Sequence, residues 1–100
     1  MSEHHNALPI PASALEDARG VEILRVWAAA GKQHVSLATG LWKDPASWGI
    51  MLTDLARHVA RAYEQNGGMR CEEALRRIRV GLDAEWGSPT DSPSGGIGET

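Results

Sequence analysis

The chain has 100 residues, of which 42% are hydrophobic, and a formal net charge of −3, which suits a single small domain. The negative balance argues against a chain built to coat nucleic acid or an anionic membrane, and the single cysteine excludes an intrachain disulfide and a cysteine-based zinc site. No run reaches the roughly 18–20 apolar residues that span a bilayer, and the N-terminus lacks the basic and apolar regions of a secretory signal, so we expect a cytoplasmic protein.

The N-terminal residues divide into a polar start and a proline-containing segment. Residues 1–6, "MSEHHN", bury too little apolar surface to order themselves and are expected to form a disordered tail. Residues 7–11, "ALPIP", cannot form a central strand because of the two prolines, but their apolar side chains could dock as an edge segment. His4 and His5 are adjacent, yet two ligands do not make a metal site, and we expect neither a metal nor another cofactor.

The next segment predicts a β-hairpin. Residues 21–29, "VEILRVWAA", are rich in β-branched and aromatic side chains, and residues 33–38, "QHVSLA", alternate apolar with small or polar side chains. A glycine suited to a turn lies between them. A helix over the first segment is the alternative, but Gly20 and the β-branched residues favour a strand. Alternation then places Leu24, Val26 and Ala28 on one face and Ile23, Arg25 and Trp27 on the other.

The stretch "LWKDPASWG", residues 41–49, has the chemistry of a helix start. Asp44 can act as the N-cap, and Pro45 suits the first helical position, where its missing N–H costs nothing. Trp42 is then expected to fold back on Trp48 as a variant of the hydrophobic staple. The alternative is that the two tryptophans clamp a ligand, because neither indole N–H has an obvious partner in the sequence.

Two helices are predicted after this start. Apolar residues recur at helical spacing over residues 45–66 and again over residues 70–86. The short link "NGGM" between them makes the helices antiparallel neighbours. The second helix also carries two pairs with the acid first at i,i+4 spacing, Glu72 with Arg76 and Glu73 with Arg77. Residues 87–100, "GSPTDSPSGGIGET", have the composition of a disordered tail.

The predicted fold class is therefore α+β, with the order ββαα in a single domain over residues 7–86. A lone two-stranded hairpin is only marginally stable, and a core of this size is barely self-sufficient. The economical solution is a homodimer whose two hairpins complete one sheet, with the helices packed on it.

Asp54, His58 and Arg61 form the most pronounced polar cluster. Their spacing of i, i+4 and i+7 places them on one side of the first helix. A carboxylate beside a histidine can orient and charge it, as general acid–base catalysis requires. No nucleophile or second acid accompanies the cluster, however, so an exposed or interfacial ion-pair network is the favoured interpretation.

Several of these segments together resemble a small bacterial family of uncharacterised domains, known chiefly from proteobacteria. The resemblance covers roughly residues 7–65, and its most specific part is the run W-x-D-P-x-x-W-G with a downstream D-x-x-x-H. It implies that residues 7–11 belong to the ordered part, and it carries no assigned activity. The matching positions are Trp42, Asp44, Pro45, Trp48, Gly49, Asp54 and His58.

Three classes of function follow from these features. The favoured class is a non-enzymatic interaction or accessory protein that acts as a homodimer, without a nucleic-acid or membrane partner; a further protein partner is left open. A second is a small-molecule binding module. A third is an enzyme with a histidine as acid–base. The candidate residues for a ligand site or an interface are Trp42, Trp48, Asp54, His58 and Arg61, with His58 as the acid–base of the third class and no residue assigned to a metal.

Overall fold

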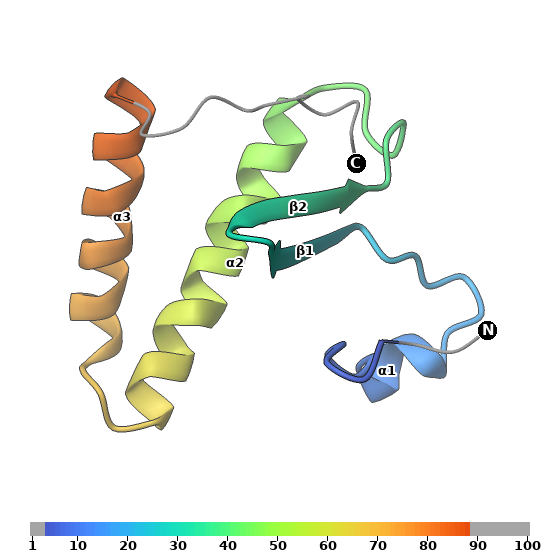
Figure 1. Ribbon diagram of the computed structural model, residues 1–100, viewed down its shortest axis with the longest axis horizontal. Coiled ribbons are helices and arrows are strands. Elements are labelled where there is room, and N and C mark those ends of the chain that lie inside the picture. Colours follow the sequence, from blue (N-terminus) through green and yellow to red (C-terminus); the bar gives the residue numbers. More distant parts are fainter. Residues whose placement is uncertain (1–3, 89–100) are drawn as a thin grey trace. The chain divides into compact units, whose positions relative to one another are not determined.

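The computed structural model describes residues 4–88 and has the element order α1, β1, β2, α2, α3 (Figure 1). Two compact units divide the chain, Met1–Ala38 and Thr39–Thr100. The predicted α+β class and its order of a hairpin followed by two helices are confirmed. Parts of both predicted tails, residues 1–3 and 89–100, lie outside the described residues.

The first unit opens with short-range structure that the sequence pattern did not predict. Helix α1 (Ala12–Leu15) is a single turn that begins after Pro11, and proline suits this place because no helical hydrogen bond needs its nitrogen. Residues 4–7 form a turn in which the Ala7 N–H donates to the His4 carbonyl at 2.9 Å. No strand is assigned to residues 7–11, and Leu8 within them is exposed.

Strands β1 (Leu24–Ala29) and β2 (Lys32–Leu37) form an antiparallel hairpin, as predicted. Its register sets Leu24 opposite Leu37 and Val26 opposite Val35, which gathers four apolar side chains on one face. Ala28 opposite Gln33 lies on the same face, and the other face carries Arg25 with Ser36, Trp27 with His34, and Ala29 with Lys32.

The hairpin turn places an alanine in an unfavourable backbone conformation. Ala30 and Gly31 both have positive φ, at 54° and 74°, as a two-residue hairpin loop of the primed type requires. Glycine adopts this region freely, whereas the Cβ of an L-residue makes the left-handed conformation cost roughly 1–2 kcal/mol. The first turn position is therefore strained, and the second is not.

Replacing Ala30 with glycine is expected to raise the free energy of unfolding by about 0.5–1 kcal/mol. The gain comes from the relieved left-handed strain, reduced by the greater entropy that glycine loses on folding. Urea denaturation measures it. Gly31→Ala, the matched change at the neighbouring position, should lower the same free energy, and equal effects of the two substitutions would refute this account of the turn.

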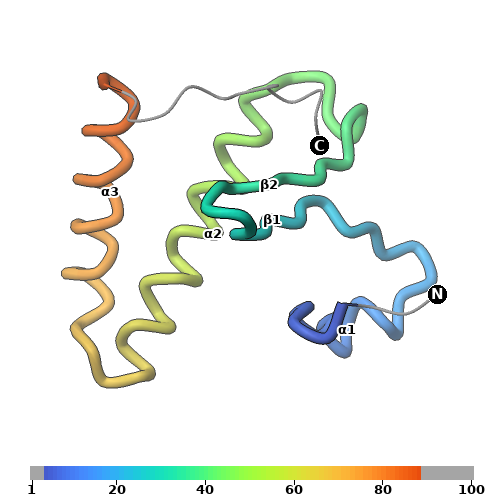
Figure 2. Tube along the Cα trace, viewed as in Figure 1, coloured from blue at the N-terminus to red at the C-terminus, as the bar shows by residue number. Residues whose placement is uncertain are grey.

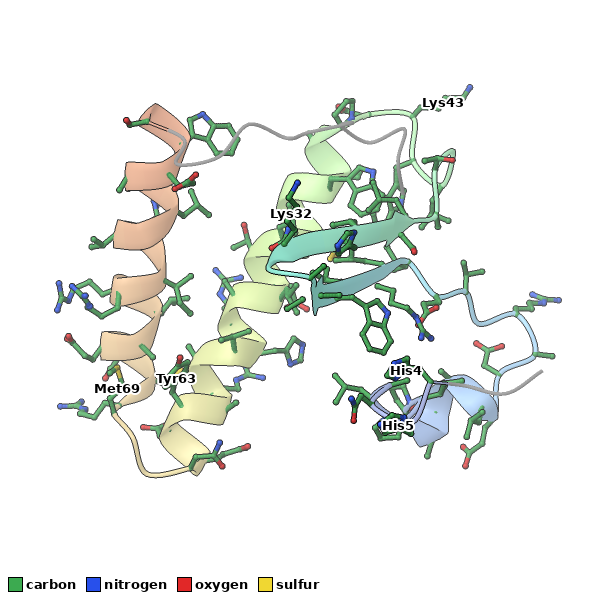
Figure 3. All side chains as sticks on the ribbon, viewed as in Figure 1. His4, His5, Lys32, Lys43, Tyr63 and Met69 are labelled. Atoms are coloured by element: carbon green, nitrogen blue, oxygen red, sulfur yellow. The ribbon has the colours of Figure 1, made fainter. Side chains whose placement is uncertain are left out.

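The second unit contains a pair of antiparallel helices, α2 (Ala46–Gln65) and α3 (Cys71–Gly87). Each of their four ends lies one residue from the predicted position. Gly67, with φ of 78°, closes α2, and the Gly68 N–H donates to the Tyr63 carbonyl at 3.0 Å, which satisfies a carbonyl at the helix end. The two axes lie close at this link and diverge toward their other ends (Figure 2). Tyr63 and Met69 lie beside the link (Figure 3).

The core of the described chain is very small. Ala60 on α2 and Ala74 on α3 are its only buried residues, at 0% and 3% exposure, and no large side chain is fully buried among residues 4–88. Along α3 the apolar stripe then becomes exposed away from the link, to 47% at Leu82 and 82% at Trp86. We infer that the helices touch through small side chains near the link, while several of their larger apolar side chains stay exposed. None of the helices in residues 4–88 has the length and the apolar composition of a membrane-spanning segment.

Candidate functional site

The two tryptophans at the start of α2 contact each other. The ring centroids of Trp42 and Trp48 lie 5.1 Å apart with an interplanar angle of 82°, an edge-to-face arrangement that aromatic pairs prefer. Both side chains are half-buried. The contact is the one expected of a staple, in which the segment before the helix folds back on its first turn.

Asp44 ties the same segment to the helix. Its Oδ1 accepts a hydrogen bond from the Ala46 N–H at 3.0 Å, so the carboxylate satisfies a donor that the helix itself leaves unpaired. The backbone of Pro45 is already helical, with φ −57° and ψ −20°, and α2 begins at the next residue. The predicted capping chemistry is therefore present, but the helix starts one residue later than predicted.

Removing this cap should weaken the start of α2. We expect Asp44→Ala to lower the free energy of unfolding by about 1 kcal/mol, because the Ala46 N–H loses its acceptor and the positive end of the helix dipole loses a negative charge. Thermal unfolding followed by circular dichroism measures the change. Asp44→Asn is the control: it keeps an oxygen acceptor and should lose less than half as much. A loss from Asn as large as that from Ala would contradict the hydrogen-bond explanation.

The polar cluster on α2 is only partly assembled. His58 Nε2 lies 3.2 Å from Asp54 Oδ2, and the two side chains are 63% and 67% exposed. Arg61 is on the same side of the helix but joins no ion pair within residues 4–88. Surrounding water screens an imidazole and a carboxylate this exposed, so their contact contributes less than about 1 kcal/mol to stability.

Helix α2 presents two different apolar sides. Ala60, fully buried, and Ala56, half-buried, are small residues on one side, and we infer that this side faces α3 because the two helices contact each other. Leu52, Leu55 and Val59 recur at i, i+3 and i+7, which places them together on an adjoining side. They are exposed by 41–49%, so the larger apolar side of α2 is partly open.

Other chemically active side chains do not gather into a site. His34 Nε2 lies 3.1 Å from the Ala29 carbonyl oxygen, and Cys71 is a half-buried free thiol. The His4 ring stacks on His5 at 4.9 Å and contacts Trp27 at 5.0 Å, and Figure 3 shows the two histidines side by side. Sequence reasoning missed the contact with Trp27, which no periodicity signals. No three His, Cys, Asp or Glu side chains of the described part of the chain lie where they could hold a metal ion.

Comparisons with known proteins point to one family and one fold. Residues 7–90 match the model of a domain of unknown function, DUF5076. Among solved structures the chain is similar to one named "Structure of a putative pyruvate dehydrogenase from the photosynthetic bacterium Rhodopseudomonas palustrus CGA009", with 31% identity and a TM-score of 0.69. The similarity covers 91% of this chain and 93% of that one. None of the curated proteins matches.

Proposed function

The chain belongs to the DUF5076 family, and we propose that it is a small non-enzymatic interaction or accessory protein that acts as a homodimer. A protein of this kind works through its surface, so its function depends on which apolar surfaces remain after folding. The family description assigns no activity, and the proposal therefore rests on the distribution of apolar side chains in this chain.

One observation carries the proposal: small apolar side chains are buried and many large ones are exposed, whereas folded proteins usually bury their large apolar side chains. Two alanines are buried, whereas fifteen large hydrophobic residues of the described chain are exposed by 39% or more. Transfer of apolar surface out of water contributes roughly 25 cal/mol per Å², so large exposed apolar surfaces mark sites of association. A stable interface buries about 800 Å² on each partner, and a second copy offers the same apolar surface in return.

The hairpin supports the same proposal. Within the described residues the sheet has two strands, and each strand therefore has an edge without a described partner strand. Two strands alone are marginally stable, and unpaired edges invite strand addition. A two-fold axis that joins two hairpins into a four-stranded sheet would pair one edge of each copy and provide a wider apolar face.

In this proposal the candidate residues on α2 belong to an interface and not to a ligand site. Trp42 and Trp48 pack on each other, so each fills the space that a clamped ligand would need. The pair of Asp54 and His58 borders the open apolar side of α2, where polar rim residues set the direction and register of a contact. Arg61, without an ion pair in residues 4–88, could then meet a carboxylate of the second copy.

Two other functions are weaker on the same observations. A small-molecule site would need the tryptophan pair to open, and a shift in tryptophan fluorescence against a metabolite panel would support it. The activity in the name of the structural neighbour would need reacting groups in a sheltered site. The imidazole and carboxylate of His58 and Asp54 lie in solvent, so this pair does not support an acid–base role in that activity.

The concentration dependence of the melting temperature tests the proposal. If folding and association are coupled, dilution favours the unfolded monomer, and the melting temperature should fall by several degrees over a hundredfold dilution. Differential scanning fluorimetry with the intrinsic tryptophans gives this directly. A melting temperature that stays constant over that range would count against a dimer.

A further inference from the structure

The hydrogen-bond phase of the hairpin determines which backbone groups face outward. The Ala38 N–H donates to the Ile23 carbonyl at 2.9 Å, and bonded pairs recur at every second residue of an antiparallel ladder. The odd-numbered residues of β1 therefore bond to β2 in the observed register. The N–H and C=O groups of the even-numbered residues point to the outer edge of β1, and these residues are Leu24, Val26 and Ala28.

The two outer edges differ in how well they suit strand addition. All three residues whose backbone points outward from β1 are apolar, and the strand contains no lysine. By the same rule the backbone of β2 points outward at Gln33, Val35 and Leu37. The strand begins with Lys32, beside the turn (Figure 3), and Lys32, Gln33 and His34 are all exposed. Lysine on an edge strand is a common protection against pairing, because addition of a strand would desolvate its charge. The edge of β1 is therefore the better partner for another strand.

We propose that two copies of the chain associate by antiparallel pairing of β1 with β1, in a register centred on Val26. This inference rests on the proposed homodimer and specifies its contact. A two-fold axis at Val26 sets Val26 opposite its own copy and Leu24 opposite Ala28 of the second copy. All of these residues have outward-pointing backbone groups, so the pairing forms about six inter-chain hydrogen bonds without breaking any within the hairpin.

The side chains in this register are complementary on both faces. On one face Val26 meets Val26, next to Leu24 and Ala28 of the other copy, which extends the apolar face across the junction. On the opposite face Arg25 lies opposite Trp27 of the second copy, and symmetry repeats the pair. A guanidinium stacks on an indole while its N–H groups bond a carboxylate, so the bonds from Arg25 to Glu22 at 3.0 and 3.3 Å are compatible with the pairing.

A pair of matched proline variants tests which edge is used. Proline at an outward position removes an N–H that the hairpin itself does not use, so each single hairpin should tolerate it. Light scattering should give Val26→Pro the mass of one chain at a concentration where the natural chain and Val35→Pro are dimers. Val35 points outward from β2 in the same way, which makes it the control. Loss of the dimer in Val35→Pro alone, or retention of it in both variants, would overturn the β1 contact and leave the homodimer standing.

Disulfide trapping gives a second measurement that does not depend on how well proline is accommodated. In a Cys71→Ser background, Val26→Cys should form an inter-chain disulfide under mild oxidation, because bonded pairs in an antiparallel ladder have Cα atoms about 5.5 Å apart. Val35→Cys in the same background should remain monomeric on a non-reducing gel. A cross-link from Val35→Cys and none from Val26→Cys would assign the contact to β2. If the natural chain is a monomer, the homodimer itself fails, and this inference fails with it.

Discussion

Ala74→Glu is expected to lower the free energy of unfolding by about 3 kcal/mol or more and to separate α3 from α2. Ala74 on α3 is 3% exposed and Ala60 on α2 is 0% exposed, and since the two helices contact each other we infer that both alanines lie in their contact. A glutamate there either buries a charge without a partner or forces the helices apart, and either outcome costs several kcal/mol. Since a domain of this size has only about 5–15 kcal/mol of stability, a large share would be lost. Urea denaturation followed by circular dichroism measures it.

The matched control for this substitution lies on the same helix. Ala84 is exposed on α3, so Ala84→Glu changes the same atoms without burying them and should shift the free energy of unfolding by less than about 0.5 kcal/mol. Similar losses at the two positions would show that helix propensity or net charge, and not close packing, explains the result. The contact of the two helices through small side chains would then have to be abandoned.

Trp48→Ala is the substitution with the second large expected effect, a loss of about 2 kcal/mol in the free energy of unfolding. Fully buried tryptophans cost about 3–5 kcal/mol when truncated, and Trp48 is half-buried against Trp42. Trp42→Ala should lose a similar amount, because each ring forms the packing surface of the other. The double variant should lose less than the sum by about 0.5–1.5 kcal/mol, which is the coupling expected of an edge-to-face pair. Chemical denaturation of all four proteins completes the cycle.

Two controls separate this structural role from a ligand-binding role. Trp48→Phe keeps an aromatic ring against Trp42 and should retain most of the stability. Trp86→Ala truncates a tryptophan that is 82% exposed, and the stability of the fold should change little. Additive losses from Trp42 and Trp48, or a negligible loss from each, would contradict the staple and favour a role in binding.

The elements that the sequence predicted are those with strong local signals. The hairpin and both long helices follow from alternation, helical spacing and the glycine-rich links, and their observed bounds differ from the predicted ones by a few residues at most. The single turn α1 was missed because four residues carry no periodicity. The left-handed conformation of Ala30 was missed as well, because the turn signal came from the neighbouring glycine.

The ion pairs on α3 show the limit of spacing rules. The sequence predicted Glu72 with Arg76 and Glu73 with Arg77, and this prediction was wrong. In the structure Glu72 pairs with Arg70, and Glu73 pairs with Arg76. An exposed long side chain can pair with several partners within reach at nearly equal energy. Sequence spacing therefore identifies the possible partners but not the pair that forms.

In the candidate site, the sequence predicted only contacts between residues that lie close together in the chain. The contact of Trp42 with Trp48 and that of Asp54 with His58 both follow from short sequence separations, and both are present. Two features were not predictable: the burial of Ala60 and Ala74 in preference to the larger side chains, and the contact of His4 with Trp27. Each depends on how distant segments meet, which neither propensity nor periodicity encodes.

Light scattering on the natural chain at micromolar concentration measures whether the chain is a homodimer. We expect twice the 10.8 kDa mass of one chain, since in the proposed homodimer a second copy covers apolar surfaces that the fold leaves exposed. A mass of 10.8 kDa that persists as the concentration rises would contradict it.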